Sequence, residues 1–139
     1  MSRCYAGGCH CGRITVELAS AKSPAELGTR TDTCTFCAKH GSLYTSDPAG
    51  ELHVTLHEPE RVQRYRFGSK TADFLICMDC GVFVAACMDA VAVLNINVLA
   101  ERAEFLANPV RVADLDGEAL EDRLARRRRN WTPLRLTSP

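Results

Sequence analysis

The feature that most constrains this chain is a cysteine pair bracketed by glycines near the N-terminus, in residues 7–12 (GGCHCG). The thiols of Cys9 and Cys11 are one residue apart, and the glycines allow a tight turn with positive φ that directs both sulfurs to one point. Structural zinc is held by four ligands in a tetrahedral arrangement, so this pair needs a second pair from elsewhere in the chain. The sequence therefore predicts a metal site that joins distant segments.

Two other cysteine pairs could complete that site. One is Cys34 and Cys37 in CTFC, and the other is Cys77 and Cys80 in CMDCG. The glycine after Cys80 matches the glycine of the first motif and favours the later pair, although the spacing alone does not decide between the two. Four thiolates around one zinc leave no open coordination position, so the completed site is expected to hold structure and to do no chemistry. The favoured set is Cys9, Cys11, Cys77 and Cys80.

The cysteine count bears on the choice between metal binding and disulfide bonding. Residues 1–4 (MSRC) lack an apolar signal segment, so we expect a cytoplasmic protein rather than an exported one. Thiols stay reduced in the cytosol, and eight cysteines there favour metal ligation. A disulfide framework is the alternative.

The charge and hydropathy of the chain argue against two classes of partner. The 139 residues carry 17 basic and 17 acidic side chains. No apolar run reaches the roughly 20 residues that a membrane-spanning helix needs. We therefore expect neither a nucleic-acid nor a membrane partner, and the sequence leaves the oligomeric state open. The run from Arg126 to Arg129 is interpreted as the solvated end of a helix, with a nucleic-acid contact as its weaker alternative.

Alternation of apolar and polar residues predicts a mainly β fold in a single zinc-binding domain over residues 1–139. Residues 13–18 and 51–57 alternate cleanly, and residues 62–67 do so more weakly. Residues 90–99 are apolar enough for a central strand.

A β-hairpin is expected around the last cysteine pair. Residues 72–76 lead into Cys77, and residues 82–87 lead out of Cys80. On the second of these strands the alternation places Cys87 on the same face as Phe83 and Ala85. We expect Cys87 to be a buried structural cysteine.

The other segments are expected to be less regular. Residues 118–129 predict a short C-terminal helix capped by Asp114 or Asp116. Residues 19–28 are typical of a loop, and residues 29–41 of a metal-pinned turn rather than a long helix.

The pair Cys34 and Cys37 could be a zinc half-site, a redox dithiol or a structural turn. A redox dithiol usually lies at a helix start beside a βαβ pattern, which this sequence lacks. A half-site needs more ligands, and the candidates are Asp32, two residues before Cys34, and His40, three residues after Cys37. Three protein ligands with an open position are the arrangement of a catalytic zinc, and that position could take a thiolate, an alkoxide or water.

Together these motifs resemble a known family. The segments 8–12 (GCHCG), 34–39 (CTFCAK) and 74–81 (FLICMDCG) have the order and spacing found in the glutathione-dependent formaldehyde-activating enzymes, over about residues 7–99. The resemblance implies a mainly β fold built around zinc, similar to the Rab-chaperone and methionine-sulfoxide-reductase zinc folds. Residues 100–139 would then be a C-terminal extension.

The resemblance also implies a site assignment. Cys9, Cys11, Cys77 and Cys80 would hold a structural zinc ion, and Cys34 and Cys37 a second, catalytic one. The family's pattern at the second site is C-x-C-x-x-C, and this chain has Asp32 at the first of those positions. A carboxylate is a harder ligand than a thiolate, so zinc affinity should fall while the Lewis acidity of a bound ion should rise.

Two functions follow from this resemblance. The first is a zinc-dependent carbon-sulfur lyase acting on the adduct of an aldehyde with a small thiol such as glutathione, with catalytic residues Asp32, Cys34 and Cys37. The second is a non-catalytic zinc-binding module that binds a small thiol or a protein partner. The missing thiolate favours the second.

Overall fold

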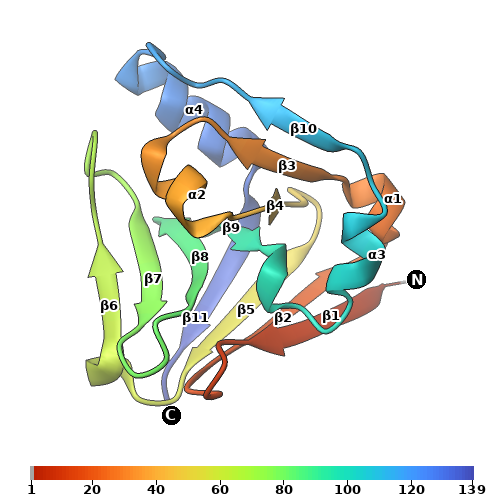
Figure 1. Ribbon diagram of the computed structural model, residues 1–139, viewed down its shortest axis with the longest axis vertical. Coiled ribbons are helices and arrows are strands. Elements are labelled where there is room, and N and C mark those ends of the chain that lie inside the picture. The colour runs from red at the N-terminus through yellow and green to blue at the C-terminus, as the bar shows by residue number, and fades with distance from the viewer. Residues whose placement is uncertain (1) are drawn as a thin grey trace.

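Strands joined into one branched, mixed sheet make up most of the regular secondary structure in residues 2–139, which are the residues that the computed structural model describes (Figure 1). The strands are β1 (Arg3–Gly8), β2 (Ile14–Ser20), β3 (Thr29–Asp32), β4 (Tyr44–Thr45), β5 (Glu51–Leu56), β6 (Val62–Tyr65), β7 (Asp73–Cys77), β8 (Phe83–Met88), β9 (Val91–Asn95), β10 (Val110–Ala113) and β11 (Thr132–Thr137). The helices are α1 (Pro24–Leu27), α2 (Thr35–His40), α3 (Arg102–Leu106) and α4 (Leu120–Asn130), with single 3-10 turns at Pro59–Arg61 and Ile96–Val98. A mainly β fold with short helices, one of them near the C-terminus, is thus confirmed.

The central strand expected within residues 90–99 is β9, and it is the junction of the sheet. One edge of β9 pairs with β8, which continues to β7 and β6. The other edge pairs with β11 at its beginning and with β4 at its end. From β11 the sheet continues through β5 and β2 to β1, and from β4 it continues through β3 to β10. Three branches therefore diverge from one buried strand (Figure 1).

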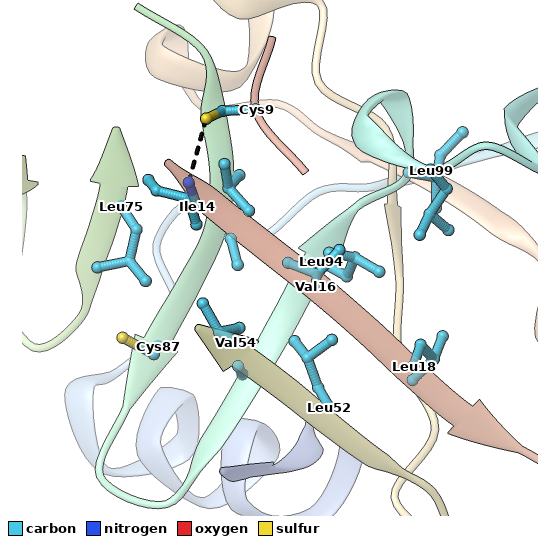
Figure 2. Close-up of a cluster of buried hydrophobic side chains, with 14 of the residues drawn as sticks. Cys9, Ile14, Val16, Leu18, Leu52, Val54, Leu75, Cys87, Leu94 and Leu99 are labelled. Carbon is cyan, nitrogen blue, oxygen red and sulfur yellow. Dashed lines mark hydrogen bonds between the residues drawn. The ribbon is translucent and has the colours of Figure 1, made fainter. Parts of the chain in front are cut away.

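The main hydrophobic core forms on one face of β2 and β5, as the alternation predicts. The pairs Val16–Val54 and Leu18–Leu52 are opposite one another in an antiparallel register, and all four side chains are buried. Their apolar side chains lie with those of Leu75 from β7 and other residues of the core (Figure 2). Burying one such aliphatic side chain contributes about 1.5–3 kcal/mol. This face therefore holds the branch of β5, β2 and β1 against the branch of β8, β7 and β6.

The expected hairpin is present as β7 and β8, but the side chain of Phe83 lies on the opposite face from the one that the alternation predicts. Leu75 pairs with Ala85 while the next residue, Ile76, pairs with Phe83, so Val84 is an extra residue that breaks the alternation. Phe83 therefore packs in a second hydrophobic cluster, and Ala85 and Cys87 stay in the main core. The expectation that Phe83 shares their face is wrong, whereas Cys87 is buried as expected.

Residues 29–41 are more regular than the expected metal-pinned turn. Thr29–Asp32 forms β3, which runs parallel to β10, and Thr35–His40 forms α2. The side chain of Cys34 caps this helix by accepting a hydrogen bond from the backbone N–H of Cys37. Within the expected loop over residues 19–28, a capping box around Ser23 starts the short helix α1.

The N-terminal cap expected for α4 is also corrected. Its N-cap residue is Ala119, without a side-chain hydrogen bond. The carboxylate of Asp114 instead accepts hydrogen bonds from the Thr33 hydroxyl and the Asp116 backbone N–H, so both acidic residues belong to the turn before the helix.

The strand β11, which the alternation does not predict, completes the sheet. It is inserted between β5, to which it runs parallel, and β9, to which it is antiparallel. Residues 100–139 thus contribute two strands to the sheet itself, β10 and β11.

Asp47, in the loop before β5, connects that loop to β2 through its buried carboxylate and to β11 through its backbone N–H. The side chain of Asp47 accepts hydrogen bonds from the Ser20 hydroxyl (2.5 Å) and the Ala49 backbone N–H (2.9 Å). The Asp47 N–H in turn donates to the Thr132 hydroxyl at 2.9 Å. Burial alone would raise the pKa of Asp47, but the hydrogen bonds from Ser20 and Ala49, together with the charge of Lys22 at 3.6 Å, outweigh it and lower the pKa.

We expect Asp47→Asn to lower the free energy of unfolding by about 1–3 kcal/mol near neutral pH, since buried donors lose a charged acceptor. Folding lowers the pKa of Asp47, so its carboxylate contributes stability above the unfolded value of about 4 and loses it as the pH falls through the folded value. The difference between wild type and variant should therefore shrink below about pH 4. Urea unfolding followed by circular dichroism at both pH values measures this.

The matched control is Asp89→Asn, because that side chain is 70% exposed. Its effect should stay within about 0.5 kcal/mol. An equal loss in the two variants, or a difference that grows in acid, would contradict the role given to Asp47.

Candidate metal centres

Four cysteines from two distant turns converge at one end of the sheet. Cys9 and Cys11 lie in the turn between β1 and β2, Cys77 is the last residue of β7, and Cys80 lies in the turn between β7 and β8. Gly12 (φ 84°) and Gly81 (φ 78°) each follow a cysteine in left-handed conformation, so both turns need the glycine that the sequence supplies. The four sulfurs lie within 4.8 Å of one another. We call this group the four-cysteine cluster.

The spacing of these sulfurs fits a metal ion. Two thiolates of a tetrahedral zinc site, each at about 2.3 Å from the ion, lie about 3.8 Å apart. The Sγ atoms of Cys9 and Cys11 are 3.7 Å apart, and those of Cys11 and Cys77 are 3.5 Å apart. The donor set and its geometry therefore match a closed zinc site.

The surroundings of the four-cysteine cluster influence its ionisation. Hydrogen bonds from the backbone and side chain of Arg13 lower the pKa of Cys11 to about 6. Burial raises the pKa of Cys9 to about 11, although the Ile14 N–H donates to its sulfur at 3.3 Å (Figure 2). A divalent cation would offset the cost of holding several thiolates together.

A second, smaller group forms where β3 meets α2. Ligand atoms of Asp32 at the end of β3, Cys34 at the helix cap and Cys37 in the first turn lie within 4.8 Å of one another. His40 is not in this group, and its ring packs at a tilt against Phe36 with centroids 4.3 Å apart. Of the two candidate third ligands, the structure brings Asp32 to the pair. We call these three residues the Asp-Cys-Cys group.

The Asp-Cys-Cys group is a partly substituted and incomplete ligand set. The sulfurs of Cys34 and Cys37 are 2.8 Å apart, about 1 Å closer than two thiolates on one zinc, so a metal would separate them. Burial raises the pKa of Cys37 to about 12 and also raises that of Asp32, so anionic donors here need a cation beside them. Three protein donors would leave one position open.

Cys37, the most buried cysteine of this group, has a polar partner, Tyr44, that the sequence does not predict. The Tyr44 hydroxyl lies 3.1 Å from the Cys37 sulfur, and the Ser42 hydroxyl donates to Tyr44 at 3.1 Å. Tyr44 is held there because β4 pairs with both β3 and β9. A two-residue strand gives too short a pattern to predict this position.

The Asp-Cys-Cys group opens on a cavity of about 500 Å³ between β3, α4 and the segment that joins β6 to β7. Aromatic side chains, among them Phe67, Phe74 and Trp131, form part of its wall. Five arginines also line it: Arg30, Arg111, Arg123, Arg126 and Arg127. The cavity therefore combines a sulfur end, an apolar wall and positive charge.

The arginine run of α4 is only partly the solvated helix end that the sequence suggests. Arg126 and Arg127 are half-buried against the cavity, whereas Arg128 and Arg129 are exposed. Helical spacing could have revealed this, because Arg123, Arg126 and Arg127 lie at i, i+3 and i+4 on one face.

The fold and these two groups define a class: a mainly β protein with two cysteine-rich clusters that could hold zinc ions. Residues 4–111 match the glutathione-dependent formaldehyde-activating enzyme family, and the chain belongs to this family. The family resemblance inferred from the cysteine motifs is thus confirmed.

The fold has a counterpart among solved structures. A crystal structure of a Rhodobacter sphaeroides protein is similar to this chain, with a TM-score of 0.63 and 23% sequence identity, covering 78% of this chain and 99% of the other. At that identity the likeness shows the fold alone. No curated protein sequence matches the chain. Among the described residues, no helix is both long and apolar enough to cross a membrane.

We expect Cys11→Ser to remove about one zinc ion per chain and to lower the free energy of unfolding by about 3 kcal/mol, which is the stabilisation a ligand gives at 100 times its dissociation constant. Elemental analysis of protein purified without chelator, together with thermal unfolding, measures both effects. Cys4→Ser is the control, because Cys4 is exposed on β1 and outside both groups.

A chelator should lower the melting temperature of wild type and Cys4→Ser more than that of Cys11→Ser. Identical melting of metal-loaded and metal-free wild type would show that the four-cysteine cluster holds no structural ion.

Proposed function

We propose that this protein is a zinc-dependent enzyme of the carbon-sulfur lyase type that acts on the adduct of an aldehyde with a small thiol such as glutathione. Its family is one of carbon-sulfur lyases, and membership implies zinc-enzyme-like chemistry related to formaldehyde and glutathione. The observation that carries the proposal is the Asp-Cys-Cys group, whose three members all face the cavity of about 500 Å³. That volume lies in the range of about 300–1,000 Å³ found for small-molecule sites.

The two cysteine groups take different roles in this proposal. The four-cysteine cluster would hold a closed, structural ion, since four thiolates fill a tetrahedral site. Asp32, Cys34 and Cys37 would hold a second ion with one open position. When bound there, zinc supplies a Lewis acid that can hold a thiolate or polarise a carbonyl oxygen.

The reaction is an addition with a simple balance. The thiol sulfur forms a bond to the carbonyl carbon of the aldehyde, the carbonyl π electrons move to oxygen, and the thiol proton ends on that oxygen. The lyase direction breaks the same carbon-sulfur bond and returns the proton to sulfur. No oxidant or reductant is required.

Tyr44 acts as a positioning residue in this reaction. Burial, together with the charge of Cys37, raises the pKa of Tyr44, so its hydroxyl stays protonated and can donate to a Cys37 thiolate. Because Ser42 donates to the same hydroxyl oxygen, the tyrosine proton is directed at the sulfur. This arrangement fixes the Cys37 side chain at the wall of the cavity.

The cavity walls exclude water from the reacting atoms. The rings of Phe67 and Phe74 pack at a tilt of 45° with centroids 4.8 Å apart, and Phe74 also packs edge-on against Phe36 of α2 at 4.8 Å. An aromatic wall beside the sulfur end lowers the local water content, and that strengthens each electrostatic contact with a bound substrate.

A specific observation supports a second candidate, a non-catalytic zinc-binding module that binds a small thiol or a protein. Asp32 stands where the family's pattern has a cysteine, and the sulfurs of Cys34 and Cys37 are too close for a shared zinc without movement. Such a module would bind one ion per chain and turn over no adduct.

Two expectations from the sequence stay predictions. One is that the fold is similar to the Rab-chaperone and methionine-sulfoxide-reductase zinc folds, and the other is that residues 1–139 form a single domain.

The zinc content of wild type and Asp32→Ala distinguishes the two candidates. For an enzyme we expect two ions per chain in wild type and one in the variant. Formation of the adduct from formaldehyde and glutathione, followed by nuclear magnetic resonance, should slow by about 100-fold or more in Asp32→Ala, since even outer partners of a metal ligand are worth 10–100-fold.

The control for the comparison of wild type with Asp32→Ala is Asp122→Ala. The carboxylate of Asp122 is exposed on α4 and does not line the cavity. It should keep both the ion count and the rate of wild type. One ion per chain in all three proteins, with no turnover, would favour the binding module.

A further inference from the structure

The cavity carries more positive charge than its own residues balance. Five arginines line it, and the carboxylates near them are Asp32 and Asp116 in the wall and Glu118, which pairs with Arg123 (3.4 Å) and Arg126 (2.9 Å). Five positive charges against three negative ones leave a surplus of two. A zinc ion held by one carboxylate and two thiolates has a net charge of minus one, so a loaded second site leaves the same surplus.

Arg30, Arg111 and Arg127 form no ion pair within residues 2–139, and of these three Arg111 is exposed. The positive charge that needs a partner is therefore that of the half-buried Arg30 and Arg127. Among residues 2–139, no carboxylate oxygen lies within the 4.0 Å ion-pair distance of either guanidinium group. Their hydrogen-bond partners are neutral: Arg30 donates to Ser46 Oγ at 2.9 Å, and Arg127 donates to Thr71 Oγ1 at 2.9 Å and to Met88 Sδ at 3.7 Å. Two half-buried cations thus face the cavity without a paired counter-charge.

The environment of these two side chains shows the cost of that arrangement. Burial, with the charge of neighbouring arginines, lowers the pKa of Arg127 to about 10, so this side chain remains protonated at neutral pH. The Nε atom of Arg127 is buried and has no hydrogen-bond partner among the described residues. Buried cations that lack a partner are destabilising, and a bound anion relieves that cost.

The position of Arg127 suits anion binding. Its guanidinium lies over the Trp131 ring, 4.9 Å from the centroid, which holds the planar group in place and leaves N–H edges for a ligand. Arg30 reaches the same cavity from β3, two residues before Asp32. Arg30, Arg127 and the Asp-Cys-Cys group all line this one cavity, so the arginine pair and the candidate metal ligands share one space.

We propose that Arg30 and Arg127 form an anion subsite that binds a carboxylate or phosphate group of the ligand whose sulfur end lies at the Asp-Cys-Cys group. The assignment of the sulfur end rests on the proposed function, whereas the anion subsite stands on the arginine geometry alone. The ligand class is a small thiol, or its aldehyde adduct, that carries at least one such anionic group. Arg127 lies outside residues 4–111, so this subsite is built partly from a segment beyond the family match.

The chain contains its own reporter for this subsite. Trp131 is its one tryptophan, is buried, and stacks under Arg127. The fluorescence of Trp131 should change saturably when wild-type protein is titrated with inorganic phosphate, succinate or glutathione at constant ionic strength. Isothermal calorimetry gives the same dissociation constants without depending on the emission of a variant.

We expect Arg127→Gln and Arg30→Gln each to raise the dissociation constant of the bound probe about tenfold or more, since a charge-assisted pair is lost. Arg127→Lys should retain part of the affinity, because it keeps the charge and loses the planar fork. Arg129→Gln is the matched control: it makes the same change on the same helix at an exposed position outside the cavity, and its affinity should equal that of wild type.

The probes separate the two chemistries. Saturation by phosphate with none by succinate supports a phosphate ester, and the reverse supports a carboxylate. No saturable binding of any probe, or an equal loss in Arg127→Gln and Arg129→Gln, would overturn the subsite.

The same titrations separate this inference from the proposed function. Phosphate and succinate contain no sulfur, so their binding without any adduct turnover would keep the subsite and overturn the lyase. Adduct turnover with wild-type KM in folded Arg127→Gln would overturn the subsite and keep the lyase.

Discussion

The convergence of four sulfurs from two turns is the constraint on which the rest of this structure depends. Cys11 and Cys77 are 66 residues apart in sequence, and their sulfurs lie 3.5 Å apart. Bringing two such turns together costs chain entropy. The sulfur contacts, and an ion pair between Arg13 and Asp79 at 3.1 Å, join the β1–β2 turn to the β7–β8 turn. With the turns fixed, the branch of β5, β2 and β1 lies against the branch of β8, β7 and β6, and the main hydrophobic core packs between these two branches (Figure 2).

The Asp-Cys-Cys group depends on that frame without touching it. Asp32 ends β3, which pairs with β10 and is joined to β4 by the pair Arg30–Tyr44, and Cys34 caps a helix of six residues. Neither element is long enough to hold a precise geometry alone. The aromatic cluster around Phe36 and the hydroxyl of Tyr44 give the group its position, and the wall of α4 encloses it.

The parts of this structure that could be predicted from sequence are those whose signal is local. Strict alternation identified β2 and β5, and glycines after Cys11 and Cys80 identified the two turns that share the four-cysteine cluster. The face on which Phe83 lies could not be predicted in this way. One extra residue in β8 reverses the alternation, and this extra residue is revealed only by the pairing of β8 with β7. Tyr44, Arg30 and Trp131 come to the cavity through contacts between distant strands, and no spacing rule encodes those contacts.

The insertion of β11 between β5 and β9 has a consequence for synthesis on the ribosome. The residues of β11 emerge after both of their partners, so the nascent chain has one facing edge of β5 and part of one edge of β9 without hydrogen-bond partners. Open edges of this kind recruit other chains, and domains whose pairing is long-range are the most exposed to that hazard while they are being made. The sheet can therefore be completed only after β11 has been synthesised. Until then the nascent chain is most vulnerable to aggregation.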